Sequence, residues 1–447
     1  MLTRPTRTHV AGPTSDHSAP DHPAPNHPAS GHSAPDHSAT LAIDEAVAAR
    51  RRAGQQILHL GFGEAGLPVL PELIDALTGA ADRNAYGPVA GTEELRAAAA
   101  SWFTRRDVAT GPEQIIVAPG SKPLLFALLA AIDGDIVLPR PAWVSYAAQA
   151  ALLGRRVLTV PIGAGAGGVP DPDQLASALH DASSAGARPG VLVLTIPDNP
   201  TGTVATADAV RQVCAIAHQH GLAIICDEIY APLCHHGNAP SAAHHLPERT
   251  IVTSGLSKSL ALGGWRIGYA RVPDNTWGAQ LRARLTGIAS ELWSSLAAPM
   301  QAVATYALDD PPEVTDHIAT SRHLHARVAT AAHAQLTALG VACRPPTAGF
   351  YLYPDLTPHA DNLAARGITT STALATALLD EHGIATLPGR AFGEPDTTLT
   401  LRIATSLLYG DTPQQRWTAL AASEPETLPW VAGNLTRLGA GLHALLH

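Results

Sequence analysis

The sequence predicts an α/β fold in which a mostly parallel sheet is sandwiched by helices, followed by a smaller α+β domain. From residue 115 to residue 272, short apolar runs bounded by turn residues alternate with helix-like stretches. Strands of this kind are typical of a parallel sheet that is covered on both faces. After Trp293 the pattern changes to long alanine-rich helices and then to GFYLYPDL and LTLRIAT, which predicts the second domain.

The expected elements follow one another in a regular order. A helical pattern begins near Leu41 in LAIDEAVAARRRAG, and further helices are expected over SKPLLFALLAAI, from about Trp143 to Leu153 and over ADAVRQVCAIAHQHG. The expected strands of the sheet are IIVAPG, DIVLPR, RRVLTVPI, VLVLTIP, LAIICDEI, TIVTSGLS and WRIGYARV. In such sheets ligands bind beyond the carboxyl ends of the strands, and the polar motifs described below fall there.

The N-terminal residues 1–40 are expected to be a disordered Pro/His-rich tail. Residues 16–40 repeat a five-residue pattern with histidines in register, at positions His17, His22, His27, His32 and His37. This composition cannot bury enough apolar area to offset chain entropy, and a His-rich tract either binds divalent metal or is a solvated extension. We expect the rest of the chain to form the N-terminal part of a small domain over residues 41–75, a large domain that contains the parallel sheet over residues 76–300, and the C-terminal small domain over residues 301–447.

Composition excludes several classes of protein. A net charge of -9 argues against nucleic-acid binding, which needs clustered Lys and Arg. No apolar run reaches the roughly 18 residues that a membrane span needs, and MLTRPTRTHV lacks the hydrophobic stretch of a secretory signal. We interpret the four scattered cysteines as reduced, mostly buried thiols of a cytoplasmic protein; they are Cys214, Cys226, Cys234 and Cys343.

Lysine is rare in this chain. Of the 29 basic residues only Lys122 and Lys258 are lysines, so chemistry that requires a primary amine has two candidates. Lys258 lies in SGLSKSLALGGWRIGYA, in an expected loop after a strand, and has no acidic neighbour in the sequence. A Schiff base needs an amine that arginine cannot replace, because the guanidinium stays protonated. The alternative for Lys258 is a surface lysine.

Polar residues after two expected strands suit a pyridine cofactor. Asp227 ends an apolar strand and needs a cationic partner; a protonated pyridine nitrogen would serve, and it makes such a cofactor an effective electron sink. Otherwise Asp227 caps the next helix. Tyr230 follows three residues later and can reach the same pocket. Asn199, in PDNPTG, either forms a turn or donates its amide to a phenolate oxygen of the cofactor.

An anion site is expected where Gly120, Ser121 and Lys122 join a strand to a helix, because free N–H groups and the helix dipole favour negative charge there. Arg266 offers a bidentate fork for the same phosphate, and Ser257 offers a hydroxyl.

Trp143 and Arg402 each have two interpretations. Trp143, in PRPAWVSY, either stacks on the pyridine face or is a core tryptophan. Arg402 is a cation inside the apolar strand LTLRIATS, and arginine is rarely buried unpaired. Its partner is either a substrate α-carboxylate, held bidentately, or an acid elsewhere in the chain.

Taken together, NPTG (199–202), DEIY (227–230), SKSLALGGWRIGY (257–269) and LRIATS (401–406) resemble the class I/II aminotransferases, which are fold-type I pyridoxal-phosphate enzymes. The likeness covers roughly residues 41–425 and includes LHLGFGEAGLP, AYGPVAGTEELR and AGFYLY. It implies the pyridoxal-phosphate-dependent transferase fold. It also implies amino-acid and 2-oxo-acid substrates and a homodimer with shared active sites.

The resemblance implies a role for each candidate residue. Lys258 would form the internal aldimine and move the substrate proton, and Asp227 would pair with the pyridine nitrogen. Asn199 and Tyr230 would contact the phenolate oxygen. Gly63, Arg402 and Asn199 would bind the substrate, and no metal is expected. The phosphate would be held by Gly120, Ser121, Lys122, Ser257 and Arg266, and by Tyr86 of the neighbouring subunit.

Two positions depart from the family pattern. Gly255 stands where a serine is frequent, so one phosphate hydroxyl is missing. Arg140 stands where an aromatic or small residue is common, and is a candidate for a second substrate carboxylate, a phosphate or only a surface acid. The expected reaction is transamination between an L-amino acid and a 2-oxo acid. Elimination or replacement, ring closure and oxidation start from the same deprotonated amino acid and stay open. A ligand-sensing regulator would need an N-terminal DNA-binding domain, for which about 40 residues leave no room.

Overall fold

The computed structural model describes residues 39–447. The five in-register histidines and residues 1–38 of the expected disordered tail therefore lie outside the described residues. Helix α1 (Ala39–Arg52) begins two residues before the expected start at Leu41.

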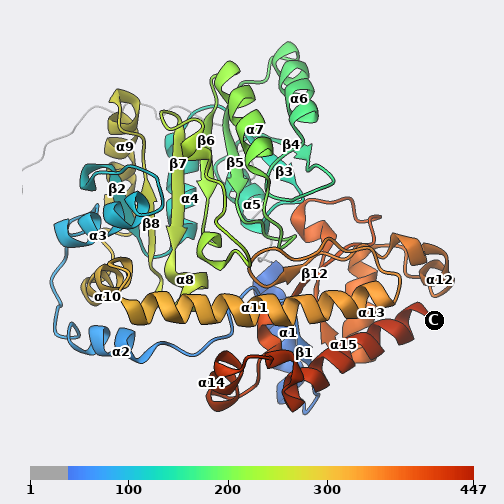
Figure 1. The fold of residues 1–447 in the computed structure, drawn as a ribbon. Coiled ribbons are helices and arrows are strands. Elements are labelled where there is room, and N and C mark those ends of the chain that lie inside the picture. Colours follow the sequence, from blue (N-terminus) through green and yellow to red (C-terminus); the bar gives the residue numbers. More distant parts are fainter. Residues whose placement is uncertain (1–38) are drawn as a thin grey trace, which may run out of the picture. The chain divides into compact units, whose positions relative to one another are not determined.

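A seven-stranded sheet is the central layer of the larger part of the described chain (Figure 1). In spatial order its strands are β2 (Ile115–Ala118), β8 (Gly268–Arg271), β7 (Thr250–Gly255), β6 (Ala223–Asp227), β5 (Pro189–Thr195), β3 (Asp135–Arg140) and β4 (Val157–Pro161). All neighbours are parallel except β8, which runs antiparallel to both β2 and β7. The sheet is thus mostly parallel, as the sequence predicts.

Helices cover both faces of this sheet. Ile136 and Ile225 belong to one buried cluster, while their chain neighbours Val137 and Ile224 belong to another, because successive side chains of a strand point to opposite faces. The first cluster includes residues of α4 (Ser121–Ala131), α5 (Val144–Leu152) and α9 (Thr276–Leu292), and the second includes residues of α6 (Pro172–Ser184) and α7 (Ala207–Gln219). Burial on both faces explains why the strands are continuously apolar.

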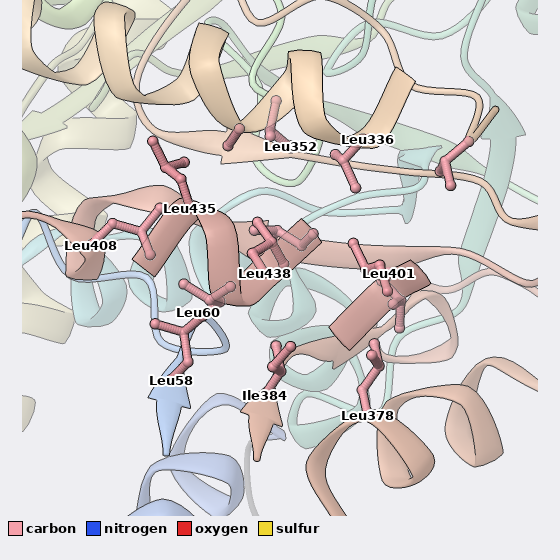
Figure 2. Close-up of a cluster of buried hydrophobic side chains, with 14 of the residues drawn as sticks. Leu58, Leu60, Leu336, Leu352, Leu378, Ile384, Leu401, Leu408, Leu435 and Leu438 are labelled. Carbon is pink, nitrogen blue, oxygen red and sulfur yellow. The ribbon is translucent and has the colours of Figure 1, made fainter. Parts of the chain in front are cut away.

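The C-terminal third builds a second core together with an early segment of the chain. Strand β1 (Leu58–His59) pairs with β10 (Ile384–Ala385). A separate antiparallel sheet has the order β11 (Leu387–Pro388), β12 (Leu401–Ala404), β9 (Tyr351–Leu352). Figure 2 shows the buried leucines that fill this core, among them Leu58, Leu352 and Leu438. The expected domain boundaries at residues 75 and 300 stay predictions.

The long helix α11 (Pro312–Ala338) joins the two cores, since Val314 packs in a cluster under the large sheet and Leu324 and Leu336 pack in the C-terminal core. The remaining helices are α2 (Pro71–Thr78), α3 (Glu93–Thr104), α8 (Leu256–Ser259), α10 (Ala298–Leu308), α12 (Ala360–Ala365), α13 (Ser371–His382), α14 (Pro413–Ala421) and α15 (Pro429–Leu446).

The four cysteines are free thiols, three of them buried and Cys343 half-buried, as expected. Over residues 39–447, no helix has both the length and the apolar character that crossing a membrane requires.

Candidate active site

The carboxyl ends of neighbouring strands bring the predicted polar residues to one edge of the sheet. Thr195 at the end of β5 is in register with Asp227 at the end of β6, and Asp227 is in register with Thr253 of β7. A cavity of about 450 Å³ lies at this edge. Except for Gly120, Tyr86 and Arg140, the candidate residues all line it: Gly63, Ser121, Lys122, Trp143, Asn199, Asp227, Tyr230, Ser257, Lys258, Arg266 and Arg402.

Lys258 lies in the short helix α8 and not in the expected loop. Its Nζ donates a hydrogen bond to the Gly63 carbonyl oxygen and lies 5.9 Å from the centroid of the Tyr230 ring. Burial, reinforced by the nearby Arg402 cation, lowers the pKa of Lys258 to about 8, because both disfavour the charged amine. This lysine is therefore a cavity amine and not a surface residue.

Asp227 is 3% exposed and is held by two donors. The Tyr146 hydroxyl donates to Oδ2 at 2.9 Å, and the Ile229 N–H donates to Oδ1 at 3.3 Å. Burial raises the pKa of Asp227 to about 6, and the hydrogen bond from Tyr146 opposes that rise. Within residues 39–447 no basic side chain forms an ion pair with this carboxylate.

Arg402 is 1% exposed and has no acidic partner in the part of the chain that the structure describes. Its Nη2 donates to the Gly61 carbonyl at 2.6 Å and its Nη1 donates to Asn199 Oδ1 at 3.2 Å. The guanidinium lies 4.8 Å from the Tyr351 ring centroid and 5.1 Å from that of Phe392, and its Nε has no hydrogen-bond partner. A structural ion pair with an acid of the described chain therefore does not account for the burial of Arg402.

The start of helix α4 forms a cationic cradle. Gly120 precedes the helix with φ 96° and offers no side-chain cap, so the first helical N–H groups are free to bind an anion. A Cβ at Gly120 would lie 2.1 Å from Arg266 Nη2, so only glycine lets the guanidinium approach this closely. Burial, and then the Arg266 cation, lower the pKa of Lys122.

The departure at Gly255 has a packing reason, since a Cβ there would lie 2.7 Å from the Ile267 carbonyl oxygen. Arg140 does not line the cavity; its charge acts on Glu394, which agrees with the surface-acid alternative. Tyr86 is 91% exposed and does not line the cavity of its own chain.

Several cavity residues were not predicted. Tyr351, whose hydroxyl lies 2.8 Å from that of Tyr230, belongs to the family-like segment AGFYLY but received no role. Tyr146 forms hydrogen bonds with Thr195 and Asp227, and Glu64 lines the cavity. The only sequence signal for Tyr146 is its position three residues after Trp143, which places both on one face of a helix.

The profile of the family "Aminotransferase class I and II" matches residues 55–408. The chain belongs to this family. The aspartate aminotransferase of Bacillus subtilis (strain 168) is 30% identical over 385 residues, covering 82% of this chain and 92% of the relative. The aspartate/prephenate aminotransferase of Thermus thermophilus is 30% identical over 360 residues, covering 79% of this chain and 88% of the relative.

Solved aminotransferase structures share the fold. The aspartate aminotransferase from Thermus thermophilus with maleate superposes with a TM-score of 0.74 at 28% identity, over 86% of this chain and 95% of that one. The Rhizobium meliloti enzyme gives a TM-score of 0.77 at 26% identity, over 93% of this chain and 98% of that one. The predicted fold is confirmed. The protein is a pyridoxal-phosphate-dependent aminotransferase, and these relatives do not favour elimination, replacement, ring closure or oxidation.

Proposed function

We propose that this aminotransferase binds pyridoxal phosphate in the 450 Å³ cavity, with Lys258 as the amine that holds it covalently and Arg402 as the anchor of the substrate α-carboxylate. The observation that carries the proposal is the amine of Lys258, which shares one cavity with the Asp227 carboxylate and the cationic start of α4 and has its pKa lowered to about 8. The residues fit the group: Asp227 suits a ring cation, and the cradle at Gly120 suits a phosphate.

When bound, pyridoxal phosphate supplies an electron sink that stabilises negative charge at the substrate Cα. The protein must then move one proton and fix the orientation of the substrate. The Nζ of Lys258 would take the proton from the substrate Cα, hold it, and give it to the cofactor carbon on the other side of the substrate nitrogen. With a pKa of about 8, about one-tenth of these amines are neutral at pH 7, against a negligible fraction for an ordinary lysine.

Arg402, supported by Tyr351, would fix the substrate, and Tyr230 would fix the cofactor. Two N–H groups of the guanidinium can hold a carboxylate bidentately, and the Tyr351 and Phe392 rings keep the guanidinium in place. Burial holds the pKa of Tyr230 well above its usual value, so its hydroxyl stays a donor. Asn199 accepts from Arg402 through Oδ1, which leaves its N–H groups for the phenolate oxygen.

Borohydride treatment of the holoenzyme followed by peptide mass mapping tests the covalent assignment. The reagent makes an imine link permanent, and the chain offers only Lys122 and Lys258 as side-chain amines. We expect the mass of the reduced cofactor on the Lys258 peptide and loss of turnover in Lys258→Ala. Labelling of Lys122, or turnover in Lys258→Ala, would contradict the proposal. A panel of amino donors, with aspartate first because relatives are named for it, then identifies the substrate by product mass.

We further propose a cytoplasmic homodimer in which Tyr86 completes the phosphate site of the partner. Support comes from the exposure of this large aromatic side chain and from the family resemblance. Mixing refolded Lys258→Ala and Tyr86→Ala chains tests it. In a hybrid dimer one site has an intact Lys258 and receives an intact Tyr86, so about a quarter of wild-type activity should return when hybrids form at random. Activity no higher than that of Tyr86→Ala alone would refute shared sites.

A further inference from the structure

Tyr146 connects Asp227 to a second buried residue. Its side chain is 1% exposed, and its hydroxyl lies 2.9 Å from Asp227 Oδ2 and 2.9 Å from Thr195 Oγ1. A carboxylate only accepts hydrogen bonds, so the single phenolic proton goes to Asp227. The Thr195 hydroxyl must then donate to the Tyr146 oxygen, which gives a directed chain from Thr195 through Tyr146 to Asp227.

We propose that Tyr146, supported by Thr195, is a positioning residue that fixes the orientation and the negative charge of Asp227 toward the ring nitrogen of the cofactor. The inference rests on the proposed function, because it takes Asp227 as the partner of that nitrogen. In this proposal Tyr146 acts through Asp227.

The fold makes this position rigid. Thr195 and Asp227 are register partners at the ends of β5 and β6, so a group that bonds to both locks two strand ends. Tyr146 reaches them from helix α5, which starts directly after Trp143. The Tyr146 and Trp143 rings pack edge-to-face at 5.2 Å. One side chain therefore fixes Asp227 and also supports the tryptophan expected to stack on the ring.

The same contact controls the charge of Asp227. Burial raises the pKa of this carboxyl to about 6, and the hydrogen bond from Tyr146 lowers it. Without that donor the pKa moves closer to neutrality, and a growing fraction of Asp227 is protonated at pH 7. A protonated Asp227 no longer attracts a ring cation. Tyr146 remains a donor throughout, because burial holds its own pKa well above the usual value.

Tyr146→Phe is the decisive variant, since it removes the hydroxyl and keeps the ring that packs on Trp143. Binding to the apo-protein is measured by equilibrium dialysis between pH 6 and pH 8.5 for pyridoxal phosphate and for a carbocyclic analogue in which C–H replaces the ring nitrogen. We expect pyridoxal phosphate to bind about tenfold to a hundredfold more weakly, as for loss of a charge-assisted hydrogen bond. The loss should grow as pH falls toward 6, and analogue binding should not change.

Two further variants separate positioning from general packing. Thr195→Val should weaken pyridoxal phosphate binding by a smaller factor, and it should add nothing when combined with Tyr146→Phe, because Thr195 acts only through Tyr146. Tyr269→Phe is the matched control: this tyrosine is equally buried in β8 and packs on Trp102 and Phe103. Its binding constants should equal those of the wild type.

The outcomes distinguish this inference from the proposed function. If Tyr146→Phe weakens the binding of both ligands equally, or of neither, the positioning role is wrong, although Asp227 can still pair with the ring nitrogen. Equal affinity of the wild-type protein for pyridoxal phosphate and the analogue would instead show that Asp227 does not meet that nitrogen, and both proposals would fail.

Discussion

Replacing Arg402 by methionine tests whether the fold buries this cation for the substrate. The guanidinium is 1% exposed and has no acidic partner within residues 39–447. A bidentate contact with an α-carboxylate contains two charge-assisted hydrogen bonds of about 1.5–3 kcal/mol each. Arg402→Met should therefore reduce kcat/KM for an amino acid by about two to four orders of magnitude.

The same substitution has the opposite effect on stability. A buried charge without a counter-ion costs free energy of folding, and its replacement by an apolar side chain of similar volume is often neutral or stabilising by about 1–4 kcal/mol. The flexible methionine side chain can fill the space between the Tyr351 and Phe392 rings. We expect the Tm of the apo-protein to stay constant or rise while the activity is lost.

A comparison of two substrates isolates the carboxylate contact. Single-turnover conversion of the bound cofactor is followed by absorbance with an amino acid and with the matching amine that lacks the α-carboxylate. Arg402→Met should slow the first reaction and leave the slow second reaction unchanged. The control is Arg271→Met, because Arg271 is 4% exposed, lies outside the cavity and donates to the Pro247 and Thr250 carbonyls. In Arg271→Met the reaction rates with both substrates should equal those of the wild type. Equal slowing of both substrates by Arg402→Met would refute the reasoning.

Three further predictions concern the cavity. Urea unfolding should show apo Lys258→Met to be more stable than the wild type by about 3 kcal/mol at pH 7, because the lowered pKa of Lys258 destabilises the folded wild-type protein. Between pH 8 and pH 10.5 Lys258 is protonated in the unfolded chain but not in the folded one. The gain in stability should therefore shrink as the pH rises through this range. Glu64→Gln should lower the pKa of Lys258, which the Glu64 carboxylate raises, and a higher midpoint of amine acylation against pH would contradict this. Gly120→Ala should displace Arg266 and weaken pyridoxal phosphate binding at least tenfold, whereas Gly221→Ala, with positive φ and free space, should not.

The large sheet was predictable because burial on both faces leaves a strong pattern. DIVLPR forms β3 over all six of its residues. Each of the other expected strands contains an observed one except VLVLTIP, since β5 begins two residues earlier, at Pro189. The limits of WRIGYARV were wrong, because Trp265 ends a 3-10 turn and Arg266 adopts a left-handed backbone with φ 59° before β8 begins. The antiparallel direction of β8 leaves no mark on hydrophobicity, since direction depends on the connection between strands.

Candidate site residues could be predicted where the residue type is rare in the chain or where a charge stands in an apolar strand. Lys258 stood out because lysine is almost excluded, and Asp227 and Arg402 because charge in an apolar strand needs a partner. Tyr146 could not be found in this way. Its segment, AWVSYAAQA, has the pattern of an ordinary apolar helix face, and its hydroxyl acquires a role only when α5 packs across the ends of β5 and β6.

Asp227 and Arg402 are buried charges of this cavity, and neither forms an ion pair within the described chain. Under the proposed function, each would face an opposite charge of the cofactor or the substrate. Asp227 suits a ring cation, the uncapped start of α4 with Arg266 suits a phosphate, and Arg402 suits a carboxylate. Internal ion pairs would make the empty protein more stable but would have to be broken when the ligand binds. When these charges are unpaired in the apo-protein, no internal ion pair has to be broken, so binding of the ligand is more favourable. The bound ligand then stabilises the native state by mass action. The low pKa of Lys258 arises from the same arrangement, since burial and the unpaired Arg402 cation together disfavour its proton.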